Sequence, residues 1–248
     1  MPDTKTREPY VRLATTSEFN EFIDTAQRAF IADPVYNYFG NVKKFLDLEK
    51  DLKPCKPRRA MIAFLTKACH IIGGRITVVV EKKEGSEEER ILSGCLWLPP
   101  HKRLEAWMVP TIVRAGILPV LKGWGMTGFR RIVFGYQSAA EKKMKDVFKA
   151  ANSKASPEES WYLALAFTAP EAQGKGFVSL LIREHIALTP NAILTLEATS
   201  KKSRDIYAHL GFEATGFGKG KVDARGINAK KEEAVGVEVW AMAKTLAM

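Results

Sequence analysis

The stretch Trp161–Leu188 limits the possible folds of this chain more than any other part of its sequence. It begins with the β-rich run WYLALAFT, after which Gly174 and Gly176 form a turn and a helical pattern starts. Such glycines leave backbone N–H groups free at a helix N-terminus, where the helix dipole favours a phosphate or pyrophosphate, and Lys175 adds a positive charge. The Walker A spacing GxxxxGK(S/T) is absent. Taken alone, the turn fits a phosphate site and a plain strand-to-helix connection about equally well.

Strand and helix patterns alternate along the rest of the chain, with a mostly helical insert at about 101–160. Thr15 and Glu18 fit a capping box for a helix that runs to Phe30 and that Asp33-Pro34 ends. The charged loop Lys82–Arg90 joins two β-rich runs as a hairpin. The order β-α-α-β-β-insert-β-α-β-α-β-β is typical of a mixed α/β sheet in one domain. The expected strands lie at about 10–14, 76–81, 91–98, 161–168, 192–198, 212–216 and 235–243, and the later helices at about 57–72, 176–188 and 200–210.

The positive charge of the chain is concentrated in the insert. The 248 residues include 38 Lys and Arg and 28 Asp and Glu, a formal net charge of +10. Between His101 and Ala150, ten basic and three acidic side chains give a net charge of +7. Such a cluster can neutralise phosphates, so a basic nucleic-acid-binding module is one alternative function. The sequence contains no RNP motif and no zinc-ligand spacing. This alternative is therefore the weaker one, and the charge of the insert stays unassigned.

Cysteine usage and the N-terminal sequence indicate the compartment. The cysteines have no CxxC spacing and no paired histidine, which argues against a disulfide framework and structural zinc and favours a reducing compartment. The polar start MPDTKTREPYV shows no secretory signal, so we expect a cytoplasmic protein. The longest apolar stretch, Ala106–Leu121, contains Arg114 and is shorter than the roughly 20 residues of a membrane span. We therefore expect no membrane span and no membrane partner. The three cysteines are Cys55, Cys69 and Cys95.

A second glycine motif, Gly123–Gly128, matches the spacing GxGxxG. The dinucleotide-binding fingerprint of that spacing also needs a strand before it and a helix after it. Here Pro119 interrupts the preceding run, and the bulky Trp124 occupies the position of the tight turn. We therefore interpret these glycines as a connection between helices of the insert.

Another element follows the glycine turn by about thirty residues: Tyr207, then Gly211, which stops a helix, and Phe212. Alone, this element fits core packing better than chemistry. Together, Ala169-Pro170, the turn Gln173–Gly176 and this element resemble the GNAT N-acetyltransferase superfamily, and most closely its puromycin N-acetyltransferase-like branch. Three further short sequences support that branch: Tyr162-Leu163-Ala164, Leu196-Glu197 and Trp240-Ala241-Met242.

The resemblance implies a fold, a co-substrate and a set of binding residues. The fold would be a mixed, mostly antiparallel, twisted sheet flanked by helices, in one N-acetyltransferase domain over residues 1–248 with the basic insert. The family motif Q/R-x-x-G-x-G/A binds the pyrophosphate of coenzyme A through backbone amides. It maps onto six consecutive residues, of which Val178 is larger than the family expects. Ser203 stands where the family often has Asn, and Phe167 and Thr168 stand where its strand pairs with the pantetheine arm. The six motif residues are Gln173, Gly174, Lys175, Gly176, Phe177 and Val178.

The resemblance also implies acetyl-CoA-dependent transfer, in which an amine attacks the thioester carbonyl directly within a ternary complex. Tyr207 matches the acid that protonates the leaving thiolate, and a strand amide near Phe167 or Thr168 would stabilise the oxyanion. The acceptor ammonium, with a pKa of about 10, must first lose a proton. Glu197 is the candidate base, and equally a candidate for a carboxylate that only orients the substrate. No metal is expected, because the four histidines show no spacing typical of a metal site or a triad.

The acceptor is the part of the function that the residues leave open. We expect a primary amine of a small molecule, because an inserted helical cap encloses a small acceptor better than it leaves an open groove for a peptide. A protein lysine or N-terminus is the alternative acceptor. No oligomeric state is predicted.

Overall fold

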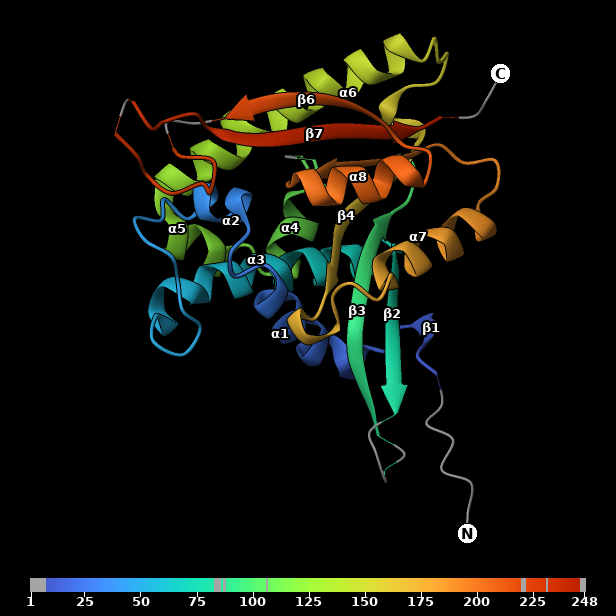
Figure 1. The fold of residues 1–248 in the computed structure, drawn as a ribbon, viewed down its shortest axis with the longest axis horizontal. Coiled ribbons are helices and arrows are strands. Elements are labelled where there is room, and N and C mark those ends of the chain that lie inside the picture. Colours follow the sequence, from blue (N-terminus) through green and yellow to red (C-terminus); the bar gives the residue numbers. More distant parts are fainter. Residues whose placement is uncertain are drawn as a thin grey trace.

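Seven strands form one sheet in the order β1-β2-β3-β4-β5-β7-β6 (Figure 1). This computed structural model describes residues 8–82, 86, 88–105, 107–219, 222–230 and 232–245, so residues 1–7 of the polar start and residues 83–85 and 87 of the predicted hairpin loop lie outside the described part. Neighbouring strands are antiparallel except β4 and β5, which are parallel, so the predicted mixed, mostly antiparallel sheet is confirmed. The strands are β1 (Tyr10–Leu13), β2 (Arg75–Lys82), β3 (Glu89–Leu98), β4 (Trp161–Thr168), β5 (Leu194–Ala198), β6 (Glu213–Lys219) and β7 (Val237–Lys244).

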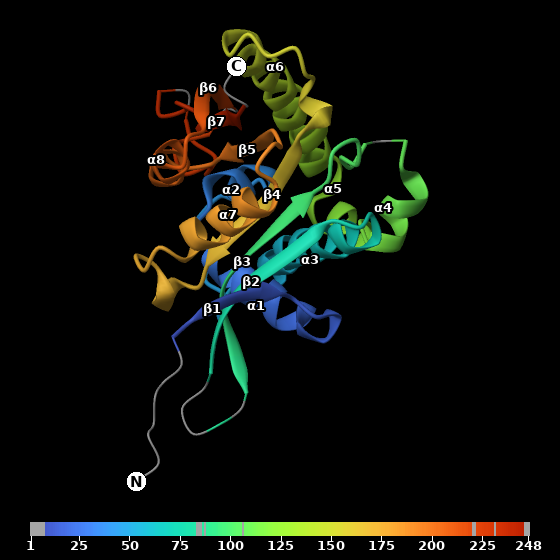
Figure 2. The same cartoon turned by 90° about the vertical axis from the view of Figure 1, so that its right-hand side faces the viewer.

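Helices cover both faces of the sheet. α1 (Phe19–Ala29) and α3 (Leu52–Ile71) pack on one face of the strands β2–β4, and α7 (Phe177–Leu188) packs on the other, as Figure 2 shows. α8 (Lys201–His209) shares the face of α7, whereas α6 (Ser138–Ala150) covers β6 and β7 on the opposite face. The sheet is therefore a middle layer, and each of its faces supplies one side of a helix-covered core.

The alternation of side chains along β4 and β5 explains these two cores. Leu194 and Leu196 of β5 belong to the core beneath α7 and α8. Leu165 and Phe167 of β4 belong to the core beneath α1 and α3, where the ring of Phe167 meets that of Phe22 edge to face at 4.8 Å. Apolar side chains of a strand that is covered on both faces enter both cores, which is why WYLALAFT is continuously hydrophobic.

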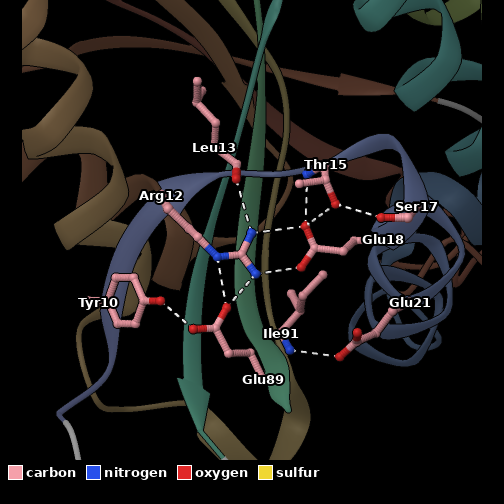
Figure 3. A network of polar contacts seen from close by, with 9 residues as sticks. All are labelled: Tyr10, Arg12, Leu13, Thr15, Ser17, Glu18, Glu21, Glu89 and Ile91. Atoms are coloured by element: carbon pink, nitrogen blue, oxygen red, sulfur yellow. Dashed lines mark hydrogen bonds and ion pairs between the residues drawn. The ribbon is translucent and has the colours of Figure 1, made fainter. Parts of the chain in front are cut away.

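A polar network ties β1 to the start of α1 (Figure 3). The carboxylate of Glu18 accepts a hydrogen bond from the backbone N–H of Thr15 at 2.7 Å, which closes the predicted capping box in the 3₁₀ turn Thr16–Glu18. Arg12 of β1 donates to Glu18 at 2.9 Å and to Glu89 of β3 at 2.7 Å. The hydrogen bonds from Arg12 lower the pKa of Glu18 to about 2. One arginine thus connects an edge strand, a helix start and a central strand.

The Asp33-Pro34 signal has a second role that the sequence reading missed. It ends the first helix as predicted, but it also begins the short helix α2 (Pro34–Phe39). The carboxylate of Asp33 accepts hydrogen bonds from the N–H groups of Val35 and Tyr36, each at 2.9 Å. An N-cap aspartate followed by proline in the first helical position is a strong start signal.

α3 is longer at its N-terminus than the sequence predicts. It begins at Leu52 rather than at Pro57, so Pro57 lies inside the helix. The N–H that this proline lacks would bond to the carbonyl of Lys53, in the first turn, so the irregularity stays close to the helix end.

The predicted helical insert between β3 and β4 holds α4 (Val109–Ala115), α5 (Leu118–Arg130), a π-helical segment at Arg131–Gln137, α6 and a 3₁₀ turn at Pro157–Glu159. The Gly123–Gly128 motif lies inside α5, so the predicted connection between separate helices is reduced to a kink within one helix, at Gly125 (φ +60°, ψ −164°). The element before α5 is the helix α4 rather than a strand. A Cβ on Gly123 would lie 2.2 Å from Cγ of Pro57. This glycine therefore allows α5 to approach α3 closely.

Candidate functional site

The parallel strands β4 and β5 pair over only three residues and then separate. Trp161–Leu163 of β4 pairs with Leu194–Leu196 of β5. Just beyond, the register between β4 and β3 shifts at Ala164, as at a β-bulge. From Ala164 to Thr168, the edge of β4 that faces β5 has no strand partner in the sheet. In Figure 1, β4 follows β2 and β3 while β6 and β7 run across them, which shows how strongly the sheet twists beyond this point. Free N–H and C=O groups along such an edge can bind an extended ligand as an added strand.

The predicted glycine turn lies at the end of β4, just after the 3₁₀ turn Pro170–Ala172. Gly174 and Gly176 have φ values of +83° and +79°, a left-handed conformation that strains any other residue. Both are exposed, and a Cβ on either would meet no atom within 4 Å. The N–H of Leu180 bonds to the carbonyl of Gly176 at 3.0 Å, so the N–H groups of the preceding residues in this first turn have no helical partner. The turn offers an open surface of backbone donors at a helix N-terminus, which fits a phosphate group.

A groove of about 690 Å³ lies between α7 and α8. It is lined by Ser179 and Arg183 of α7 and by Lys202, Asp205 and His209 of α8. Ser179 is in the first turn of α7, so the groove adjoins the glycine turn. Arg183 and Lys202 outnumber the one carboxylate of the lining, Asp205, so the groove suits an anionic ligand better than a cationic one.

Tyr207 of α8 is buried in the core beneath α7 and α8. The centre of its ring lies 6.0 Å from that of Phe212, the neighbour that the sequence singled out. Burial, with a smaller contribution from the thiol of Cys95, raises the pKa of Tyr207 above its usual value of 10.0. The phenol therefore keeps its proton throughout the neutral range, as a proton donor must.

Glu197 of β5 accepts a hydrogen bond of 2.5 Å from the hydroxyl of Tyr162 on β4. The guanidinium of Arg103 lies over the ring of Tyr162, 4.7 Å from its centre, and donates to the hydroxyl of Thr195 at 2.8 Å. Burial raises the pKa of Glu197, while the Tyr162 hydrogen bond and the charge of Arg103 oppose that shift. A carboxylate with a raised pKa is a better proton acceptor near neutral pH than an ordinary glutamate.

Tyr207 and Glu197 approach the sheet from opposite faces. Leu196 and Ala198 of β5 share a core with Tyr207, so the intervening Glu197 points to the other face. Leu163 and Leu196 form the last pair before β4 and β5 separate. A reacting group held in the gap between the strands would thus have a proton donor on one face and a carboxylate on the other.

No protein-family model and no curated protein matches this sequence, whereas solved structures with the same architecture do. A structure from Corynebacterium glutamicum, described as histone acetyltransferase HPA2 and related acetyltransferase, is 22% identical over 97% of both chains, with a TM-score of 0.57. Arylalkylamine N-acetyltransferase 2 from Aedes aegypti is 11% identical over 97% of this chain and 100% of its own, with a TM-score of 0.55. The polyamine N-acetyltransferase of Drosophila melanogaster is 11% identical over 96% of this chain and 100% of its own, with a TM-score of 0.53.

This chain has the GNAT fold. The fold that the glycine turn and the Tyr207 element predicted is therefore confirmed. At these identities the likeness concerns the arrangement of helices and strands. The closer similarity to the puromycin N-acetyltransferase-like branch stays a prediction.

Four further predicted site residues of this GNAT-fold chain are buried or half-buried: Phe167, Thr168, Phe177 and Val178. Phe167 is buried, and its carbonyl accepts a hydrogen bond of 2.5 Å from the hydroxyl of Ser93. Thr168 is half-buried, and its carbonyl accepts a long hydrogen bond of 3.5 Å from the side-chain amide of Gln173. Phe177 and Val178 pack against the core. Val178 is half-buried at the start of α7.

Lys175 and Ser203 complete the predicted set. Lys175 is exposed beside the two glycines. Ser203 lies on α8, where its hydroxyl is 2.8 Å from that of Ser200, the N-cap residue of this helix. In this conformation Ser203 supports the helix cap. A ligand would have to compete with Ser200 for its hydroxyl.

The structure adds residues that sequence reasoning did not assign to the site. Tyr162 and Arg103 join Glu197, and Arg183 with Lys202 lines the groove beside the glycine turn. Tyr136, from the π-helical segment of the insert, packs edge to face on Phe39 at 5.3 Å, and the charge of Glu197 contributes to its raised pKa after burial. The insert therefore reaches the face of the sheet that carries Glu197. Within the described ranges no three His, Cys, Asp or Glu residues gather as metal ligands would.

Proposed function

We propose that this protein is an acetyltransferase that transfers the acetyl group of acetyl-CoA to a primary amine of a small molecule. The observation that carries the proposal is the gap between β4 and β5, with the glycine turn at its end, Tyr207 on one face and Glu197 on the other. The names of similar structures, which include an arylalkylamine, an agmatine and a polyamine N-acetyltransferase, support amine acetylation.

The proposed binding mode follows the order of these features along β4. The backbone edge of Ala164–Thr168, including Phe167 and Thr168, would pair with the extended amide-bearing arm of coenzyme A. The turn Gln173–Val178 would bind the pyrophosphate through its N–H groups and Lys175. The groove with Arg183 and Lys202 supplies further positive charge for the phosphates. Ser203 is the proposed contact from α8.

The proposed chemistry needs two proton transfers. The acceptor amine attacks the thioester carbonyl, the new C–N bond forms, and the C–S bond breaks. The carboxylate of Glu197 takes the proton of the ammonium, directly or through water, and the phenol of Tyr207 gives a proton to the leaving sulfur. A backbone N–H of the free β4 edge would stabilise the negative charge on the carbonyl oxygen.

The same proposal covers the domain and the compartment. We propose that residues 1–248 form one acetyltransferase domain with the basic insert, and that it acts in the cytoplasm. Support for the single domain comes from the insert, whose Ala115 and Val120 lie in one core cluster with Phe22 and Phe167.

The decisive experiment has a binding step and a reaction step. Acetyl-CoA should raise the melting temperature, since a ligand at 100 times its Kd that binds only the native state adds about 2.7 kcal/mol of stability. Acetyl-CoA consumption is then measured over amines, polyamines, aminonucleosides, aminoglycosides and peptides. No thermal shift at millimolar acetyl-CoA would overturn the proposal. Turnover with peptides alone would replace the small-molecule acceptor with a protein lysine or N-terminus.

A further inference from the structure

The outer surface of the insert combines exposed apolar side chains with positive charge. We define the insert face as the exposed side of Trp107, α4, α5 and the adjoining π-helical segment. Of its apolar side chains, Trp107 is 73% exposed, Met126 69% and Phe134 67%. The other large apolar members are Val109, Val113, Leu118, Leu121 and Phe129, and the exposed basic members are Arg114, Lys122 and Arg130.

The opposite sides of α4 and α5 are used for packing. Ala115 of α4 and Val120 of α5 are buried in the core that includes α3, and Ile112 and Trp124 pack against that core. Figure 2 shows α4 and α5 as an outer layer beside α3. The exposed members of the insert face on α4 and α5 therefore lie on the sides of these helices that do not pack against the core. At the surface, Phe129 and Phe134 contact each other edge to face at 6.2 Å.

The charge of the insert face is positive except at its border, where the exposed carboxylate of Glu105 accepts a hydrogen bond of 2.7 Å from the indole N–H of Trp107. From Trp107 to Gln137 the sequence contains no Asp or Glu. Arg114, Lys122 and Arg130 form no ion pair with another side chain in the described part of the chain. The surface therefore calls for a partner that is both apolar and anionic.

We propose that the insert face attaches this protein to the surface of a membrane that contains anionic phospholipids. Aromatic and aliphatic side chains beside Lys and Arg on a helical surface are the features of segments that lie in the membrane interface. A second copy of this chain fits less well, since a symmetric contact would bring together two surfaces that each carry Arg114, Lys122 and Arg130. The proposal revises the sequence-based expectation of no membrane partner. It does not involve a span, because no described helix has the length and apolar content to cross a bilayer.

The anionic leaflet that faces the cytoplasm attracts basic segments near its surface. The exposed apolar side chains would enter the boundary between headgroups and acyl chains while the arginines and the lysine contact the phosphates. Attachment should therefore need both anionic lipid and apolar side chains. The proposal is independent of the acetyltransferase function, because none of these side chains belongs to the candidate site.

The test is co-sedimentation of the full chain with vesicles of phosphatidylcholine alone and of phosphatidylcholine mixed with phosphatidylserine. The wild type should bind the mixed vesicles, and added salt should weaken that binding. The double variant Met126→Asp, Phe134→Asp should bind at least about tenfold more weakly. Val235→Asp, at a residue 72% exposed outside the insert face, is the matched control and should bind as the wild type does. Circular dichroism and thermal melts confirm that each variant is folded.

The charge of the insert face is tested separately by Arg114→Glu with Arg130→Glu, which should abolish the preference for the mixed vesicles. Three results would overturn the proposal. One is a wild type that does not bind the mixed vesicles, and another is a control variant that loses as much binding as the double variant. The third is a wild-type dimer that the double variant converts to a monomer, since the insert face would then be a contact between copies.

Discussion

Replacing Gly174 by alanine should leave the protein folded and weaken the proposed binding of coenzyme A. The φ of Gly174 is +83°, and a Cβ there would meet no atom within 4 Å. The free energy of unfolding should therefore fall only by the backbone strain of a left-handed alanine, about 1–2 kcal/mol. For a chain of this size each kcal/mol lowers the melting temperature by about 2–4 °C.

The effect on binding should be larger than this strain explains. The added methyl group would stand on the open surface where phosphate oxygens approach the N–H groups of the turn. A hydrogen bond to a charged group contributes about 1.5–3 kcal/mol, so the loss of one such bond weakens affinity by about 10- to 150-fold. Isothermal titration with coenzyme A measures the Kd directly.

Gly116→Ala is the matched control. Gly116 has a φ of +92°, nothing lies within 4 Å of its Cβ position, and it follows α4 in the insert. Alanine at position 116 should cause similar backbone strain without changing the affinity for coenzyme A. Equal affinity for coenzyme A in folded Gly174→Ala and wild type would refute the reasoning, and so would an equal loss in the control.

Three further predictions concern protons. Tyr207→Phe should lower kcat by about 10²–10⁴-fold with little change in the Kd of coenzyme A; unchanged turnover in steady-state assays would remove Tyr207 as the acid. In the wild type, kcat/KM should fall as pH falls through the raised pKa of Glu197, because the carboxylate becomes protonated. Glu197→Gln should lose activity, and its kcat/KM should no longer fall in this acidic range. A variant whose pH profile of kcat/KM is unchanged would show that Glu197 has only a structural role. Because Arg12 lowers the pKa of Glu18 from 4.5 to about 2, the stability from this carboxylate is complete above pH 4.5 and lost as pH falls toward 2. Urea unfolding should therefore show a smaller acid-induced loss in Glu18→Gln than in the wild type, and equal losses would contradict the assigned ion pair.

Local signals predicted most of the fold, because the physical causes lie within a few residues. The capping box of Thr15 and Glu18 and the left-handed Gly174 and Gly176 are contacts or conformations of neighbouring residues. Asp33-Pro34 shows the limit of such signals. A proline after a helix reads as a stop, yet the same pair is a good N-cap for a next helix that is only six residues long.

The candidate site was harder to predict, because its contacts depend on register. Tyr162 and Glu197 meet because β4 and β5 are parallel and Tyr162 faces Thr195, and no spacing along the chain indicates that register. Tyr136 reaches the same face from a π-helical segment that has no sequence signature. Site residues that belong to a sequence motif could be predicted from the sequence. Site residues that strand pairing or the insert brings to the site could not.

The three-residue contact between β4 and β5 has a mechanical consequence. The strands β1–β4 and β5–β7 are each joined by antiparallel pairing, and this short seam is the strand contact between the two halves of the described sheet. A ligand bound between β4 and β5 would contact both halves of the sheet and hold them together. Its binding free energy would then add to the cohesion of the sheet, so that occupancy and local opening are thermodynamically linked. Amide hydrogen exchange at Leu163 and Thr195 would report that link directly.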